Sequence, residues 1–210
     1  MSGELFNNEA KEIKNPTAEN YKNIKPENDI TPAEVNNYWK SEFQEVAQPK
    51  QYYDDNGKLY REGDSLLPDS EYEVNGYKYN TDARGRITSA QGKLRMRDED
   101  YNRELEEVRN LEGQDYRTED DRGHLMGHQF GGSDKLENLV PMDSKLNREG
   151  GDYYKMEKTL ADAVKDGADV RLKVEPIYEN DSNRPSEFKV SYTIDGDRQT
   201  TVFRNEREVQ

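Results

Sequence analysis

Two stretches of the chain alternate apolar and polar residues, and this alternation is the feature that most constrains the fold. DVRLKVEPIY (169–178) and EFKVSYTI (187–194) each place an apolar or aromatic residue at every second position. A period of two is typical of a strand that buries one face and leaves the other in water. Asp195-Gly196 then predicts a turn into a further strand, TTVF (200–203). Together these residues predict two or three antiparallel strands.

Similar signals occur earlier in the chain. Residues 50–97 read as β structure, and YEVNGYKY (72–79) predicts a hairpin because its central Asn-Gly pair suits a type I′ turn. KMEKTLADAVKDG (155–167) has apolar residues at helical spacing and a glycine where the helix should stop. The sequence therefore predicts one α+β domain over residues 50–210, with a mixed or antiparallel sheet.

Residues 1–49 are predicted to be a flexible N-terminal linker with one short helix. Residues 1–30 are polar and lack a hydrophobic period, whereas in 30–46 a Thr-Pro-x-Glu capping pattern precedes apolar residues at helical spacing. The charge run at 98–121 predicts a solvated helix or loop. We expect neither a membrane span nor a signal peptide in this chain, because no stretch has the required apolar length or pattern.

The composition excludes several kinds of site. The chain has no cysteine, which excludes disulfide frameworks, cysteine-ligated metals and cysteine nucleophiles. Its two histidines cannot form a three-histidine zinc site. With 45 acidic and 31 basic residues the formal net charge is −14, which argues against binding of nucleic acid or anionic lipid through overall charge.

The segment 120–150 gathers the residues best suited to chemistry. A neutral His124 can act as a general base, and Arg122 lies two positions earlier, so both side chains share one face of an extended strand. This pair suits a phosphodiester, since a guanidinium binds a phosphate oxygen while an imidazole activates water. Asn147 offers an amide oxygen to a hard cation. Taken singly, the histidine fits a structural role and the asparagine a helix cap; only the combination favours catalysis.

The same segment resembles the DNA/RNA non-specific endonucleases, whose active site is the ββα-metal or His-Me finger. The motifs that carry the resemblance are DRGH (121–124), Phe-Gly-Gly (130–132), ENLVPM (137–142), LNREG (146–150) and, upstream, YKYNTDARGRI (77–87). The likeness continues through the strands near the end of the sequence and covers about residues 72–205.

The resemblance implies a metal-dependent hydrolase of DNA or RNA that leaves a 5′-phosphate. His124 would be the general base, and Asn147 the one direct protein ligand of a Mg²⁺ ion, with Mn²⁺ as an alternative. Arg122 would contact the phosphate, and Asn138 would hold the metal-site loop or the substrate.

The family also places a glutamate on the following helix, bonded to a metal-bound water. Glu157 is the nearest match, but it lies ten residues after Asn147, further than the family pattern. If a loop ending at Gly151 separates the two positions, Glu157 could still reach the site, whereas a continuous helix would turn it away.

Three further residues have open interpretations. Arg86 and Arg184 stand in the matching upstream and C-terminal signatures, so the resemblance implies contacts with substrate phosphates. A structural ion pair is the alternative for each. His128 follows His124 by four positions, but the zinc motif HExxH requires glutamate where Leu125 stands.

Domains of this branch occur as the toxin part of secreted bacterial polymorphic toxins, including those exported by type VII systems. The resemblance therefore implies a secreted effector that acts in the cytoplasm of a target cell. It also implies a cognate immunity protein that covers the active site.

The negative charge leaves two alternatives to the nuclease open. One is a non-catalytic acidic module that mimics nucleic acid, and the other is a hydrolase of a different phosphodiester. For a nuclease, substrate binding would depend strongly on salt and on local cations. The candidates are Lys93, Arg95, Arg97, Arg122, Lys145, Arg148 and Arg184.

Overall fold

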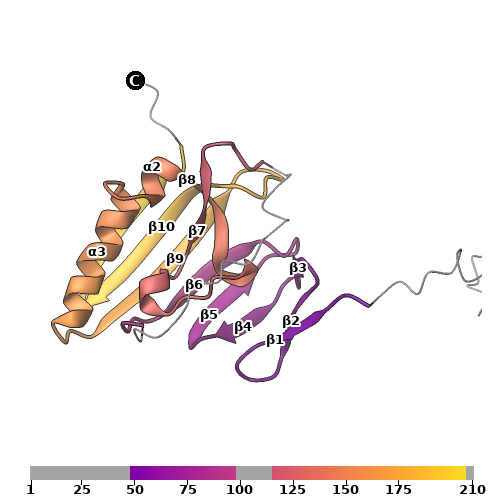
Figure 1. The fold of residues 1–210 in the computed structure, drawn as a ribbon, viewed down its shortest axis with the longest axis horizontal. Helices are drawn as coiled ribbons and strands as arrows, with labels where there is room; N and C mark the ends of the chain where they lie inside the picture. Colours follow the sequence, from indigo (N-terminus) through magenta and orange to yellow (C-terminus); the bar gives the residue numbers. More distant parts are fainter. Residues whose placement is uncertain (1–47, 98–114, 207–210) are drawn as a thin grey trace, which may run out of the picture. The chain divides into compact units, whose positions relative to one another are not determined.

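The computed structural model describes residues 48–97 and 115–206 (Figure 1). Three expected features lie wholly or largely outside the described residues. They are the linker at 1–49, of which only the last two residues are described, the short helix at 30–46, and most of the charge run at 98–121. The described chain from Pro49 onward belongs to one compact unit.

Strands dominate the described chain. They are β1 (Gln51–Tyr53), β2 (Leu59–Glu62), β3 (Ser65–Leu66), β4 (Glu71–Val74), β5 (Tyr77–Thr81), β6 (Ile87–Lys93), β7 (Asp120–His124), β8 (Leu139–Asp143), β9 (Val170–Tyr178), β10 (Pro185–Ile194) and β11 (Asp197–Arg204). The helices are α2 (Ser144–Asn147) and α3 (Asp152–Lys165), with short 3₁₀ turns η3 (His128–Phe130) and η4 (Leu136–Asn138).

The central element is a six-stranded sheet in the order β11-β10-β9-β6-β5-β4. Every neighbouring pair in it is antiparallel. β1, β2 and β3 form a small second sheet, and β7 pairs with β8 as a two-stranded hairpin. The α+β class with an antiparallel sheet, as the sequence predicts, is confirmed.

The turns form where the local sequence favours them. Asn75 and Gly76 adopt positive φ angles of 55° and 74° between β4 and β5, which is the geometry that their residue types tolerate. Asp195 and Gly196 do the same between β10 and β11, at 50° and 93°. The predicted stop at Gly167 follows the end of α3, with a φ of 90°.

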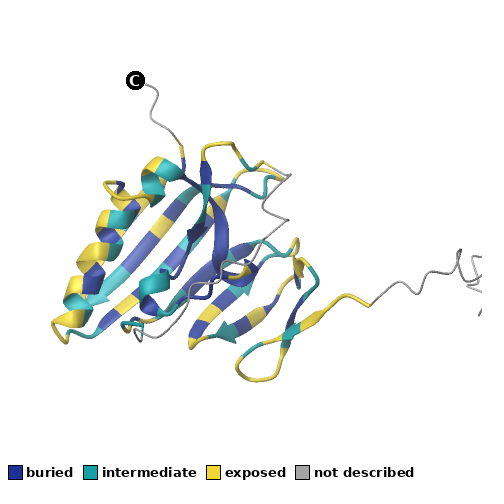
Figure 2. Ribbon diagram, in the orientation of Figure 1, coloured by how far each residue is buried: buried dark blue, intermediate teal, exposed yellow. Residues whose placement is uncertain are grey.

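One face of the large sheet is covered and the other is open within the described chain. Figure 1 shows α3 and the β7–β8 hairpin on the same face. Along β9, Val170, Leu172 and Val174 are buried while the residues between them are more exposed, an alternation visible in Figure 2. Buried side chains of α3, such as Leu160, belong to the same core as these valines.

Tyrosines form much of this core and connect it to the loop after β7. Tyr72, Tyr77 and Tyr153 are almost fully buried. Their hydroxyls donate hydrogen bonds to the backbone oxygens of Glu137, Phe130 and Leu125, respectively. Each ring therefore fills the core while its polar end fixes the loop. None of the described helices has both the length and the apolar composition needed to cross a membrane.

Candidate active site

The β7–β8 hairpin and α2 form a strand–strand–helix unit that carries the DRGH residues and Asn147. In the hairpin, Arg122 lies opposite Pro141 and His124 opposite Leu139. A Cβ atom on Gly123 would come within 2.5 Å of Met142 Cβ, so glycine allows the two strands to lie this close. α2 begins directly after β8 and contacts both strands.

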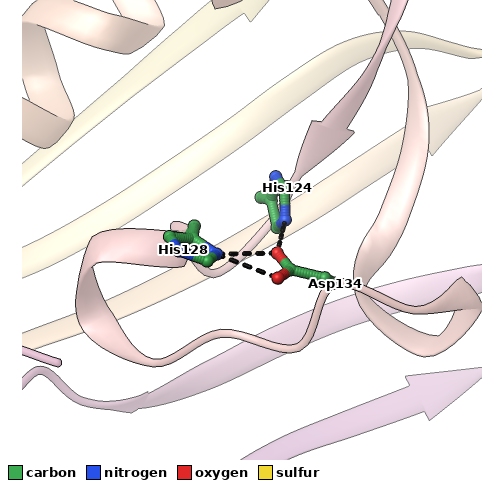
Figure 3. Close-up of side chains that lie close together, drawn as sticks. All are labelled: His124, His128 and Asp134. Carbon is green, nitrogen blue, oxygen red and sulfur yellow. Dashed lines mark hydrogen bonds and ion pairs between the residues drawn. The ribbon is translucent and has the colours of Figure 1, made fainter. Parts of the chain in front are cut away.

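His124 is held by a carboxylate that lies ten residues further along the chain. Its Nε2 atom lies 2.8 Å from Asp134 Oδ1, and both side chains are buried (Figure 3). Burial alone raises the pKa of Asp134, but hydrogen bonds from His128 and His124 outweigh it and hold this pKa below its usual value. An ionised carboxylate only accepts hydrogen bonds, so the proton lies on Nε2 and Nδ1 is the basic nitrogen of His124.

His128 approaches the same carboxylate from the other side. Its Nδ1 lies 2.8 Å and 3.0 Å from the two oxygens of Asp134. The ligand atoms of His124, His128 and Asp134 lie within 4.8 Å of one another, a spacing that could hold a metal ion. However, Arg97 lies 3.9 Å from Asp134 Oδ2 and in contact with the His128 ring, and this positive charge opposes a second cation there.

Asn147 is oriented by the first residue of the DRGH motif. Its Nδ2 donates to Asp121 Oδ2 at 3.1 Å, so the Oδ1 end of the amide is the potential metal ligand. Arg148 binds the same carboxylate, at 2.9 Å and 2.6 Å. Burial raises the pKa of Asp121, but the hydrogen bonds from Arg148 and Asn147 outweigh it and lower this pKa. The result is a half-buried amide oxygen beside an ionised carboxylate, a donor set that fits a hard divalent cation.

Glu157 is separated from Asn147 by a loop, which is the condition under which the sequence allows it to reach the site. α2 ends at Asn147 and α3 begins at Asp152, so a loop separates Asn147 from Glu157. Its carboxylate lies against the loop after β7. The contact is so close that a Cβ atom on Gly127 would collide with Glu157 Oε1. Burial raises the pKa of Glu157 to about 7. A carboxyl group with this pKa can exchange a proton near neutral pH.

Asn138 is fully buried and holds the loop that carries Asp134. Its Oδ1 accepts from the Met126 backbone N–H at 2.8 Å, and its Nδ2 donates to the oxygens of Met126 and Ser133 at 2.8 Å and 2.9 Å. Of the two roles that the resemblance implies, these contacts favour holding the loop over touching substrate. Arg122 is half-buried on β7, two positions before His124.

The two remaining arginines are engaged inside the protein. Arg184 is buried and forms two hydrogen bonds with Asp120, at 2.8 Å and 2.9 Å. Arg86 pairs with Asp82 at 2.7 Å and lies over the Tyr178 ring at 4.7 Å. The N–H groups of both arginines are thus directed to protein acceptors. The structure favours the ion-pair alternative for each.

Comparison with known proteins adds a family match. A family model described as DNA/RNA non-specific endonuclease matches residues 68–196. Type VII secretion system protein EssD of Staphylococcus aureus strain USA300 is 38% identical over 128 residues, which covers 59% of this chain and 20% of EssD. The EssD protein of strain Newman matches to the same extent. The matched part of this chain thus spans 20% of the length of these curated relatives.

Solved nuclease structures also share similarity with the chain. An extracellular endonuclease is 21% identical, with a TM-score of 0.42 over 59% of this chain and 74% of that one. The structure of Sda1 nuclease with a bound zinc ion is 16% identical, with a TM-score of 0.47 over 76% of this chain and 85% of that one.

Proposed function

The chain belongs to the DNA/RNA non-specific endonuclease family, and we propose that it is a Mg²⁺-dependent, sequence-non-specific endonuclease acting on DNA, with RNA as a second polymer to be tested. The observation that carries the proposal is the strand–strand–helix unit, which presents His124 and Asn147 on adjoining elements, each oriented by a carboxylate, Asp134 and Asp121 respectively.

The proposed chemistry begins with His124. Its Nδ1 accepts the proton of a water molecule that attacks phosphorus, and the contact between Nε2 and Asp134 stabilises the imidazolium that results. Arg122, on the same strand, binds a non-bridging phosphate oxygen. The P–O3′ bond then breaks and the leaving oxygen takes a proton from solvent water, which leaves a 5′-phosphate and a 3′-hydroxyl.

Asn147 Oδ1 would be the direct protein ligand of the metal, with Asp121 fixing the orientation of its amide. A bound Mg²⁺ ion supplies positive charge near the phosphate and the leaving oxygen. Glu157, with its raised pKa, holds or releases a proton beside the loop that follows His124. One direct ligand is enough, because Mg²⁺ retains most of its water and is held further by substrate phosphate.

Cleavage of plasmid DNA and total RNA, with Mg²⁺ and with EDTA, tests this proposal. We expect wild type to cut only with metal and His124→Ala to lose at least about 100-fold, the size typical of removing a general base. Lys158→Ala, an exposed change on α3, is the matched control and should cut like wild type. No cutting by wild type at low salt, with Mg²⁺ or Mn²⁺, would overturn the nuclease and favour the nucleic-acid mimic. Hydrolysis of small phosphodiesters alone would favour the other hydrolase.

We also propose that the chain is the toxin part of a protein exported by a type VII secretion system. The support is the identity with EssD, which is itself named as a type VII secretion system protein. A nuclease that acts in the cytoplasm of a target cell needs a cognate immunity protein in the producing cell. Expression in a bacterial cytoplasm should be toxic for wild type and tolerated for His124→Ala, and a protein encoded beside the nuclease should restore growth.

A further inference from the structure

A cleft on the open face of the large sheet collects basic side chains in an otherwise acidic protein. Its volume is about 420 Å³. The cations that line it are Lys78, Arg171, Lys173 and Arg198, and none of its lining residues is acidic. These four cations stand out because the whole chain has a net charge of −14.

The register of the sheet brings these residues together. Lys78 pairs with Gln91, Gln91 with Lys173 and Lys173 with Ser191, so one row crosses β5, β6, β9 and β10. A second row pairs Arg171 with Thr193, and Thr193 with Arg198 on β11. Side chains of directly paired residues share one face of a sheet, so the rows lie side by side.

This face points away from the active site. Lys78 is exposed between Tyr77 and Tyr79, which are fully buried on the other face of β5. The Tyr77 hydroxyl donates to the backbone oxygen of Phe130, in the loop that follows His124. Because successive residues of a strand point to opposite faces, Lys78 and the cleft lie on the side opposite to this loop.

The charges around the cleft leave cations available for a ligand. Asp169 pairs with Arg171 at 3.4 Å and Glu175 with Lys173 at 2.7 Å, and Glu73 lies opposite Lys78 in the pairing of β4 with β5. The first pair is exposed and the second is partly exposed, so competing anions can exchange with them at modest cost. Within the described chain, neither Lys78 nor Arg198 forms an ion pair.

We propose that this cleft is a second nucleic-acid site, which binds the phosphate backbone of the substrate polymer outside the active site. The inference rests on the proposed nuclease function. Four strand spacings separate β5 from β11, about 19 Å. One strand of a duplex presents roughly five phosphates over that length. Lysine and arginine at the walls, with Gln91, Ser191 and Thr193 between them, provide charge and hydrogen bonds to phosphate without reading bases.

A polymer held on this face stays close to the enzyme, which raises the concentration of scissile bonds around the active site. The cleft should therefore lower KM for long substrates and leave the hydrolysis of small phosphodiesters unchanged. The same site explains how a chain of this net charge can capture a polyanion, since binding follows local rather than overall charge.

The first test measures binding in the His124→Ala background with a labelled 30-base-pair duplex, after a gel shows that the duplex stays intact. The variant carries Lys78→Gln, Lys173→Gln and Arg198→Gln. The control carries Lys155→Gln, Lys158→Gln and Lys165→Gln, an equal loss of charge on exposed positions of α3. We expect the cleft variant to lose about 10-fold in affinity and its log–log salt slope to fall by about 2 to 3, at roughly 0.9 per phosphate contact.

The second test measures cleavage in the wild-type background. The cleft variant should show about a 10-fold higher KM for a long duplex, with an unchanged rate on bis(p-nitrophenyl) phosphate, which reaches only the active site. Equal duplex affinity in the cleft variant and the control would overturn the proposal. A higher affinity in the cleft variant would also overturn it. If no protein cuts any substrate while the cleft variant still loses affinity, the catalytic proposal fails and the binding site stands.

Discussion

Asn147 donates a hydrogen bond from Nδ2 to Oδ2 of Asp121, at 3.1 Å, and this contact selects Oδ1 as the amide atom for the metal role proposed above. Asp121 also accepts two hydrogen bonds from Arg148. The guanidinium is 71% exposed, whereas the carboxylate is 19% exposed. Solvent weakens the pair with Arg148 more than it weakens the contact that orients Asn147.

Asp121→Ala should weaken activation by Mg²⁺. Without an acceptor for Nδ2, the amide of Asn147 can rotate and present nitrogen instead of oxygen. Changes to such supporting residues typically cost about 10–100-fold in metal affinity or activity. The Mg²⁺ concentration at half-maximal cleavage should rise by that order. Arg148→Ala is the control and should shift it less than about 3-fold, because it keeps the contact between Asp121 and Asn147. Equal shifts in both variants would contradict this role.

Asp134→Asn should lower kcat while leaving KM for long DNA nearly unchanged. An asparagine can donate a hydrogen bond to Nε2 of His124, which would place the imidazole proton on Nδ1. Nδ1 would then be unable to accept the proton of the attacking water. In Ser-His-Asp enzymes the equivalent change lowers kcat by about 10⁴, and we expect a loss of about 10² to 10⁴ here.

His128→Gln is the matched control for that change. It removes one of the two histidines on Asp134 but keeps the contact with His124. We expect a loss of less than about 10-fold, in line with a residue that supports a general base without replacing it. If His128→Gln costs as much as Asp134→Asn, the cluster acts as a unit and the assignment of His124 alone as the base is wrong.

Glu157→Gln should reveal the raised pKa of this carboxyl as a change in stability with pH. Its pKa is about 7 in the folded protein, against an ordinary value of 4.5. The folded state therefore binds more protons between pH 4.5 and 7, and wild-type stability falls as pH rises through that window.

The expected advantage of Glu157→Gln over wild type grows from near zero at pH 4 to an upper bound of about 3 kcal/mol at pH 7.5, at 1.36 kcal/mol per pKa unit. Urea unfolding in EDTA measures it, and Glu149→Gln, an exposed change, is the control. A difference that stays constant over this range would show that burial does not raise this pKa.

The sequence predicted elements whose cause is local. Alternation gave β9 and β10, the Asn75-Gly76 and Asp195-Gly196 turns follow from residues that tolerate positive φ, and the stop of α3 follows from Gly167. His124, Arg122 and Asn147 stand out by residue type, and the resemblance to the endonuclease family adds the DRGH motif; the structure places these residues on one strand–strand–helix unit.

Contacts between distant residues could not be predicted in this way. No sequence pattern shows that Asp134 is the acid in the loop after β7 that reaches His124. The buried amide of Asn138 shapes that loop through its hydrogen bonds with Met126 and Ser133. Asp120 and Arg184 are 64 positions apart in the sequence, and only the folded chain brings them together. The basic cleft was also missed, since its lysines and arginines come together through strand register.

Arg184 offers the sharpest separation between a structural and a substrate-binding role. Its side chain is 4% exposed and that of Asp120 is 1% exposed, so removing one partner leaves a buried charge without its counter-ion. Breaking a buried pair costs about 3–5 kcal/mol, and we expect that loss for Arg184→Ala and for Asp120→Ala in urea unfolding. The double variant should lose less than the sum, because neither charge remains. A phosphate contact would behave differently: Arg184→Ala would raise KM for DNA with wild-type stability, and Asp120→Ala would not couple to it.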